Sequence, residues 1–189
     1  MKREGFDAFC RACLDTLKAT RTRYLVVGGL AVTVVGEPRL TADLAVIVFA
    51  EIAALRKVVT YAVGHGFTAN VEDEIEAARQ GGSIRLERGN YHFDVIVRSL
   101  FIEDLAHAHS RLRKLFGRSV RFPSPEDLAV LKVVAGRPRD LLDVEGIVRR
   151  HAGKLDRPYI ETTLERVCEL AEDHEILDRW RRLLERSTA

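Results

Sequence analysis

The sequence has no uninterrupted apolar run of about 18 residues, so it contains no candidate membrane-spanning helix. Its first ten residues, MKREGFDAFC, lack the apolar stretch of a secretory signal peptide, and we therefore expect a cytoplasmic protein. No internal repeat or low-complexity segment stands out along the 189 residues. This length suits one domain with an appendage, or two small domains, and is sufficient to bury a core.

Neither sign of charge dominates the chain. The 30 basic and 28 acidic side chains leave a formal net charge of +2. That balance neither demands nor excludes a nucleic-acid partner, because local patches matter more than the total. The composition, 47% hydrophobic and 31% charged, is ordinary for a globular protein.

Cysteine is scarce, with 3 residues in the chain. Cys10 and Cys13 form a C-x-x-C motif, which occurs in metal and redox sites. Both nevertheless fall on the apolar stripe of a helix predicted over 6–19. A free cysteine on such a stripe behaves as a small hydrophobic residue, so we interpret both thiols, and the isolated Cys168, as packing residues.

Hydrophobic patterning predicts an α/β core in the first part of the chain. The glycine pair Gly28-Gly29 and the later Gly36 bracket an apolar run that is typical of a short buried helix. The run SIRLERGNYHFDVIV predicts a β-hairpin around Gly89-Asn90. The acidic segment 67–80 fits neither period. Helices are predicted over 6–19, 30–36, 51–63 and 102–115, and strands over 23–27, 43–49, the two arms of 83–97 and the SVRF run at 119–122.

The rest of the chain is predicted to be helical. Ser124 and Asp127 form a capping box before an apolar run, and Pro138 forces a break after Arg137. Further helices are predicted over 140–150, 158–171 and 175–186, with Trp180 in the core. We therefore predict an α/β (α+β) fold, with a small mixed, twisted sheet flanked by helices and a helical C-terminal extension. The predicted domains are an α/β core over 1–120 and a helical part over 121–189.

Two acidic residues lie at unusual places on the predicted strands. Asp43, in RLTADLAVIV, opens a buried strand, and Asp94 lies in the middle of another, where a carboxylate is costly unless it is paired or bound to metal. Acids at i and i+2 of a strand share one face and can hold metal ions together. Metal-dependent nucleotidyl transfer uses such a face to offset charge on the attacking and leaving oxygens. In this chain, however, the residue two positions after Asp43 is Ala45.

Two segments carry a resemblance to a known family. YLVVGGLAVTVVGEPRLTADLAVIV resembles the first motif of the nucleotidyltransferase-fold superfamily, a glycine pair followed further along by D-x-D. Its R-x-T-x-D form is similar to the AbiEii-type and MenT-like toxin nucleotidyltransferases of bacterial toxin–antitoxin and phage-defence systems. SPEDLAVLKVVAGRPRDLLDVEGI resembles that group's second block, a lysine followed by R-D-x-x-D. The resemblance covers about residues 22–150.

The resemblance implies a role for each matching residue of the α/β part. Gly28 and Gly29 would face the nucleotide phosphates. Asp43 and Asp94 would ligate metal, and Asp94 would also help to deprotonate the attacking hydroxyl. The implied cofactor is Mg²⁺ or Mn²⁺, and the implied substrate is an NTP.

The second block implies further contacts. Lys132 would touch a nucleotide phosphate, and Asp143, or as a second choice Asp140, would complete the catalytic site. Arg39 would hold the loop or a phosphate, and Thr41 would lie with it at the nucleotide. The implied partners are an RNA acceptor, such as a tRNA 3′ end, and a cognate antitoxin, with no membrane.

Ala45 departs from the family pattern, because alanine offers no oxygen to a metal. Asp43 and Asp94 could still hold one ion, but the bridging ligand for a pair is absent. Two explanations stay open: a natural degenerate member that binds without turnover, or a chain in which a catalytic acid has been replaced. The otherwise intact pattern favours the second.

Each acid of the core also has a structural interpretation when it is considered alone. Asp43 could cap or pair with Arg39 at the strand entrance. Asp94 could pair with Arg85 or His92 across the hairpin.

The same is true of the later charged residues. Lys132 could extend along a helix surface, with Asp140 and Asp143 as helix-surface acids. The basic run RLRKLFGRSVR over 111–121 could guide RNA phosphates or be the solvated face of a helix. We interpret His107 and His109 as solvated rather than as ligands.

We therefore predict metal-dependent transfer of a nucleoside monophosphate from an NTP to an acceptor, expected to be RNA, with growth arrest as the outcome. One alternative is a catalytically dead nucleotide- or partner-binding module. Another is a nucleotidyltransferase acting on a small molecule, of the antibiotic type.

Overall fold

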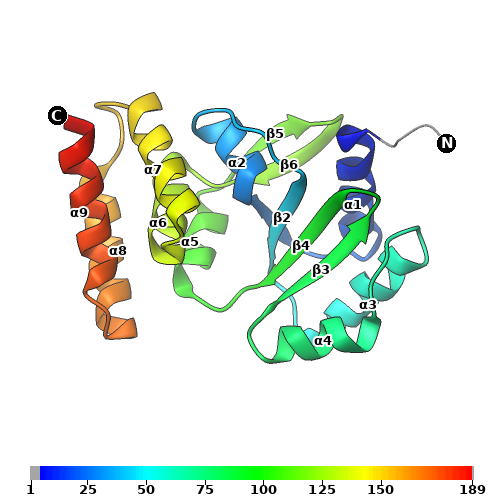
Figure 1. The fold of residues 1–189 in the computed structure, drawn as a ribbon. Coiled ribbons are helices and arrows are strands. Elements are labelled where there is room, and N and C mark those ends of the chain that lie inside the picture. Colours follow the sequence, from blue (N-terminus) through cyan, green and yellow to red (C-terminus); the bar gives the residue numbers. More distant parts are fainter. Residues whose placement is uncertain (1–4, 189) are drawn as a thin grey trace. The chain divides into compact units, whose positions relative to one another are not determined.

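The structure, a computed structural model, describes residues 5–188 (Figure 1). The prediction that the first ten residues contain no signal peptide concerns residues that lie partly outside this range. The chain forms two compact units by its contacts. Unit 1 comprises the chain up to Leu30, then Leu40–Leu100 and Arg111–Phe122. Unit 2 comprises Ala31–Arg39, Phe101–Ser110 and the chain from Pro123 onward. The domain division at residue 120 stays a prediction.

A mixed four-stranded sheet forms the centre of unit 1, in the order β1-β2-β4-β3. The central strands β2 and β4 are parallel, and both outer pairs are antiparallel. The predicted small mixed sheet is therefore confirmed. Its strands are β1 (Tyr24–Val27), β2 (Asp43–Val48), β3 (Ser83–Arg88) and β4 (Tyr91–Val97).

Alternation along β3, in the middle of β4 and at the start of β2 separates an apolar face from a polar one. Burying each large apolar side chain contributes about 2 kcal/mol relative to leaving it exposed. Because cross-strand partners share a face, the same alternation puts Asp43, Ala45 and Asp94 together on the other side. The apolar face consists of fully buried side chains, including Leu44, Val46, Ile84, Leu86, Phe93 and Val95.

Helices cover the apolar face of this sheet. Helix α1 packs against β4, with Phe9 against the ring of Tyr91. Cys10 and Cys13 on α1 are fully buried and form no disulfide, which confirms their interpretation as core. The helices of unit 1 are α1 (Phe6–Ala19), α3 (Ile52–Val63), α4 (Val71–Arg79) and the start of α2 (Gly28–Val35).

Helix α4 lies in the acidic segment that the sequence pattern left unassigned. Asn70 caps it, because its side chain accepts hydrogen bonds from the backbone N–H groups of Glu72 and Asp73. Acidic residues fill the first turn, where the helix dipole favours negative charge. The acidity of this segment therefore marks a helix start rather than a loop.

The helix predicted over 102–115 is wrong in its second half. Helix α5 (Phe101–Ala108) ends early, and β5 (Arg111–Leu115) pairs antiparallel with β6 (Arg118–Phe122). Phe116 and Gly117 both have positive φ, 47° and 79°, as a tight two-residue hairpin turn requires. Phenylalanine is rare in that conformation, so the sequence lacked the Asn-Gly signature that would have indicated the turn.

Unit 2 is helical, as predicted. Its core includes Trp180 and Ile147, both fully buried. Pro138 begins α7 as its first residue rather than preceding a helix that starts at 140. No helix in residues 5–188 is both long and apolar enough to span a membrane. Besides α5 and the rest of α2, the helices are α6 (Pro125–Ala135), α7 (Pro138–Arg150), α8 (Arg157–Ala171) and α9 (Glu175–Thr188).

The predicted cap at the start of α6 is confirmed at Ser124, while the Asp127 carboxylate accepts from the Ser124 hydroxyl and from Tyr159 rather than from the Ser124 backbone N–H. Ser124 Oγ accepts a hydrogen bond from the backbone N–H of Asp127 at 3.0 Å, and it also donates to the Asp127 carboxylate. We expect Ser124→Ala to lower the free energy of unfolding by about 1 kcal/mol or more, because both bonds are lost. Urea denaturation followed by circular dichroism measures this.

The matched control is Ser119→Ala on the exposed side of β6, for which we expect a change within about 0.5 kcal/mol. Equal losses in the two variants would contradict a capping role for Ser124.

Candidate active site

The polar face of the unit 1 sheet brings four positions together. In the parallel pair β2–β4, Asp43 lies opposite His92 and Ala45 lies opposite Asp94. Asp43 and Ala45 also share a face along β2, as His92 and Asp94 do along β4. Ala45 thus occupies the position from which a carboxylate would neighbour both Asp43 and Asp94.

Both carboxylates of this face have partners from the same chain. Arg85 donates two hydrogen bonds to Asp94, from Nε at 2.7 Å and from Nη2 at 3.0 Å. The Asp94 bond raises the pKa of Arg85 above its usual range. His92 Nδ1 lies 3.0 Å from Asp43 Oδ1. The pairing of Asp94 with Arg85, offered as its structural interpretation, is confirmed. The pairing of Asp43 with Arg39 stays a prediction.

A glycine lets helix α2 begin against this face. Gly28 has φ +65°, and a Cβ added to it would lie 2.9 Å from the Cβ of Ala45. A side chain at position 28 would therefore meet both backbone strain and a steric clash. The positive end of the α2 dipole, at Gly28 and Gly29, begins beside Ala45, which suits a phosphate.

Thr41 fixes the entrance to β2. Its hydroxyl accepts a hydrogen bond from the backbone N–H of Asp43 at 3.2 Å and lies 3.3 Å from the Asp43 carbonyl oxygen. This local turn holds Asp43 at the first position of the strand. The predicted contact of Thr41 with a nucleotide stays a prediction.

In unit 2, the second sequence block forms a buried network of charges. Lys132 is 5% exposed, and its Nζ lies 2.7 Å from an oxygen of Asp140 and 2.7 Å from an oxygen of Asp143. Arg39 donates to both oxygens of Asp143, at 2.7 and 3.1 Å, and Arg137 donates to Asp140 at 2.5 Å. The interpretations of Lys132, Asp140 and Asp143 as surface residues are therefore wrong.

The network controls the protonation of Asp140. Burial would raise the pKa of this carboxyl, but hydrogen bonds from Lys132 and Arg137 outweigh burial and hold the pKa below its usual range. Asp140 is therefore ionised at neutral pH, where it balances the buried ammonium group.

Helix geometry and one tight contact assemble this network. Asp140 and Asp143 are three apart on α7 and so face the same way, toward the last turn of α6. The segment that carries Arg39 is held to α7 by Glu37, which accepts two hydrogen bonds from Arg149. Gly146 permits this approach, because a Cβ there would lie 3.2 Å from the Cβ of Glu37.

Comparisons with known proteins bear on the fold. No protein-family model matches the chain, and no curated protein matches its sequence. The chain is similar in structure to an antigenic nucleotidyltransferase-like protein from Paracoccidioides brasiliensis, with 15% identity, 92% of each chain covered and a TM-score of 0.54. It is also similar to the solution structure of the antibiotic-resistance factor ANT(2″)-Ia, with 13% identity, 89% of this chain and 96% of that chain covered, and a TM-score of 0.58.

The chain has the nucleotidyltransferase fold. The crystal structure of ANT(2″)-Ia in complex with adenylyl-2″-tobramycin gives the same result, with 12% identity, 82% and 92% of the two chains covered and a TM-score of 0.54. These likenesses agree with the fold that the first motif indicated, while membership of the superfamily and of its AbiEii-type and MenT-like toxin group stays a proposal.

Within this nucleotidyltransferase fold, the predicted site residues fall into two groups. Unit 1 brings together Gly28, Asp43, Ala45 and Asp94, with Gly29 and Thr41 next to them in sequence. Unit 2 brings together Arg39, Lys132, Asp140 and Asp143. The catalytic, metal-binding and nucleotide-binding roles of all of them stay predictions.

The donor set of unit 1 fits one hard cation. Asp43 and Asp94 offer carboxylate oxygens, and Mg²⁺ is commonly held by one or two carboxylates together with phosphates and water. In residues 5–188, no cluster of three or more His, Cys, Asp or Glu is placed to hold a metal. A second, bridged ion lacks its ligand, because position 45 is alanine.

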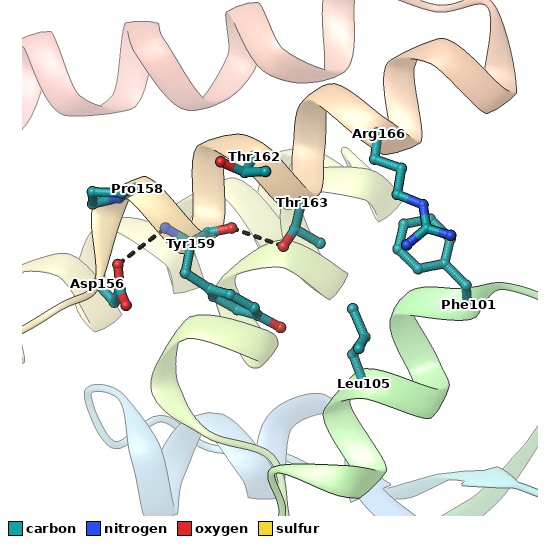
Figure 2. A pocket seen from close by; sticks show the side chains of 8 residues that line it. All are labelled: Phe101, Leu105, Asp156, Pro158, Tyr159, Thr162, Thr163 and Arg166. Carbon is teal, nitrogen blue, oxygen red and sulfur yellow. Dashed lines mark hydrogen bonds between the residues drawn. The ribbon is translucent and has the colours of Figure 1, made fainter.

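Unit 2 also contains a pocket of about 430 Å³ between α5 and α8, and no predicted site residue lines it (Figure 2). Arg166 lies over the ring of Phe101 at 4.4 Å, and Leu105 and Tyr159 add further wall. Its lining is mostly apolar, and it contains none of the residues that nucleotidyl transfer needs. We therefore do not place the active site here.

Next to this pocket lies a network that sequence patterns did not predict. Buried Asp127 accepts a hydrogen bond from Tyr159 Oη at 2.6 Å and lies 3.1 Å from His109 Nδ1. Burial, and then the bond to Asp127, raises the pKa of Tyr159. His109 is 46% exposed, which agrees with its interpretation as solvated, and it adds a contact to Asp127 that the sequence did not predict. The three residues are far apart in sequence. The sequence therefore singled out only Asp127, as part of the helix cap, and gave no indication that His109 and Tyr159 contact it.

Lys132 provides a direct test of the buried network. We expect Lys132→Met, which keeps the length of the side chain, to lower the free energy of unfolding by about 3 kcal/mol, because two buried carboxylates lose their shared cation. Urea denaturation of the purified chain measures this. The control Lys154→Met, at an exposed lysine of the same unit, should change stability by less than about 0.5 kcal/mol. Equal effects would show that Lys132 is not the buried counterion of these carboxylates.

The lowered pKa of Asp140 predicts a pH dependence. A carboxyl whose folded-state pKa lies below its unfolded value, about 3.9, adds stability above that value and loses it as the pH falls through the folded pKa. We expect the stability difference between the wild-type chain and Asp140→Asn to be constant from pH 7 to about pH 5 and to shrink below about pH 4. Urea titrations across this range measure it.

The exposed Asp73→Asn variant corrects for the loss of one acidic group. A difference between wild-type and Asp140→Asn chains that stays flat down to pH 3 would contradict the stabilisation of ionised Asp140 by its cations.

Proposed function

We propose that this protein binds a nucleoside triphosphate and belongs functionally to the enzymes that transfer a nucleoside monophosphate to an acceptor hydroxyl. The observation that carries the proposal is the position of Ala45. It lies opposite Asp94 in the sheet register, on the same face as Asp43 and against Gly28 at the start of a helix. A single carboxylate there would complete a set of three beside a phosphate-binding helix end.

Each side chain of this face has a chemical task in the proposal. Asp94 takes the proton of the acceptor hydroxyl, as a carboxylate within hydrogen-bond reach of a nucleophile can. Asp43 and Asp94 hold the cation, which neutralises charge on the phosphate oxygens when it is bound. The glycines at the start of α2 allow the triphosphate to approach backbone N–H groups. The proposal also includes the phosphate contacts that the resemblance implies for Lys132 and Arg39. In the structure both side chains form ion pairs with Asp143.

In its present form we expect the chain to bind but not to transfer. Ala45 removes one carboxylate, and the bidentate bond from Arg85 competes with a cation for Asp94. The disabling change is therefore local, whether alanine is the natural residue or a replacement. In either case, replacing Ala45 with an acid tests whether this position alone prevents transfer.

We propose RNA, by resemblance a tRNA 3′ end, as the acceptor, with Mg²⁺ or Mn²⁺ as the cation. A toxin role with growth arrest, and a cognate antitoxin, belong to the same proposal. A small-molecule acceptor is the second candidate, favoured by the complex of the structurally similar ANT(2″)-Ia with adenylyl-2″-tobramycin. The two candidates differ in whether transfer requires nucleic acid.

The test compares the chain with Ala45→Asp and with the uncharged control Ala45→Asn. Each is incubated with each labelled NTP, Mg²⁺ or Mn²⁺, and either total RNA or an aminoglycoside. We expect all three to bind NTP, and we expect Ala45→Asp to label RNA about 10²- to 10³-fold faster than the other two, because only it adds an ionised ligand. Isothermal titration and scintillation counting measure binding and transfer.

Failure of every variant to bind any NTP would overturn the proposal. Binding by all three with transfer by none would leave a catalytically dead binding module. Transfer to the aminoglycoside without RNA would select the small-molecule candidate.

A further inference from the structure

We propose that the β5–β6 hairpin of unit 1 is a docking surface for the phosphate backbone of single-stranded RNA. The inference deepens the proposed function, since it rests on RNA being the acceptor. It concerns a part of the chain that the nucleotide site does not use. The sequence predicted a helix over the first half of this segment and a strand over 119–122, and the structure shows that the two halves pair as a hairpin.

The hairpin carries a dense, one-signed charge. Arg111, Arg113 and Lys114 on β5 are all exposed. In the part of the chain that the structure describes, no ion pair within 4.0 Å involves any of the three. No acidic residue occurs from Leu105 to Pro125. Such an unneutralised cluster fits a polyanion, whose condensed counterions are released when cations replace them.

Unit 1 holds the hairpin through β6 and its turn, on the face that Arg111 and Arg113 share with their register partners Phe122 and Val120. Arg118 donates two hydrogen bonds to Asp15 of α1, both at 2.8 Å, and the ring of Phe116 in the turn meets that of Phe6. Val120 and Phe122 on β6 are buried, and β6 packs against β1. The cations of β5 are therefore presented from a fixed strand, which limits the ordering cost of binding.

The geometry of β5 also favours an extended, flexible strand of nucleic acid. Side chains two apart on a strand lie on one side at a spacing of about 6.7 Å, so Arg111 and Arg113 form a row. Leu112, 61% exposed, and Lys114 lie on the other face, opposite Arg121 and Ser119 in the register. Strand β5 has one pairing partner in its sheet, so its other edge is open to contact.

Two other roles would explain the same charges. Edge strands often carry lysine or arginine because charge prevents pairing with another chain. A basic surface also fits an acidic protein. Phosphate binding differs from both in its salt dependence, since each phosphate contact on single-stranded RNA contributes about 0.7 to the slope of log K against log salt.

The experiment measures binding of a short fluorescent single-stranded RNA by anisotropy over a range of salt, without NTP or metal. The test variant replaces Arg111, Arg113 and Lys114 with Gln. Its charge-matched control replaces Arg181, Arg182 and Arg186, all exposed on α9, with Gln. We expect the test variant to lose at least 10-fold in affinity and about 2 units of salt slope. We expect the control to lose neither.

A second variant, Arg111→Lys with Arg113→Lys, keeps the charge and should retain the salt slope of the wild-type chain, which separates lost charge from lost folding. Equal behaviour of the two Gln variants would overturn the proposal in favour of edge protection. Stronger competition by polyglutamate than by unlabelled RNA would overturn it in favour of an acidic protein. NTP binding, measured separately on the same variants, tests the proposed function independently of this surface.

Discussion

A carboxylate that leaves water must be matched by a cation or a hydrogen-bond donor, because its desolvation costs several kcal/mol. This constraint organises both units. In unit 2, Asp140 and Asp143 are almost fully buried and share Lys132, with an arginine on each. In unit 1, Asp94 is held by Arg85.

The two solutions have different consequences for chemistry. Lys132 is enclosed, so removal of either side of its network leaves a buried charge without a partner. Arg85 is 56% exposed and Asp94 17%, so that pair can open toward water at little cost. The proposed function, in which a metal ion and a nucleotide take the place of a protein cation, requires the second arrangement. The buried network instead joins α6, α7 and the segment that ends at Arg39.

Ala45 is important because of its position in the sheet rather than because of its residue type. An alanine in a strand is unremarkable, but this one touches the place where a Gly28 side chain would lie and pairs in register with Asp94. The nucleotidyltransferase fold supplies the helix end and the strands around it. In the proposed function, transfer depends on one carboxylate at position 45, which the fold alone does not determine.

Local patterns predicted much of the fold. The period of the α1 residues, the alternation of β3 and β4, the Gly28-Gly29 pair and the capping box at Ser124 all specify structure within a few residues of themselves. The alternation also fixed which residues share a face with Asp94. The likeness of the two motifs then identified the fold, because their order along the chain is informative even where each alone is weak.

Tertiary structure decided which charges meet. Arg39 donates to Asp143, which is distant in sequence, and Asp43 lies beside the ring of His92. Residues Arg111–Leu115 form a strand where a helix was predicted. The chain turns at Phe116, which has a positive φ that is rare for phenylalanine, and its ring packs against Phe6. The sequence by itself determined which residues lie on which side of each element. Only the folded chain determined the partners, since an ion pair depends on distance in space and leaves no period in the sequence.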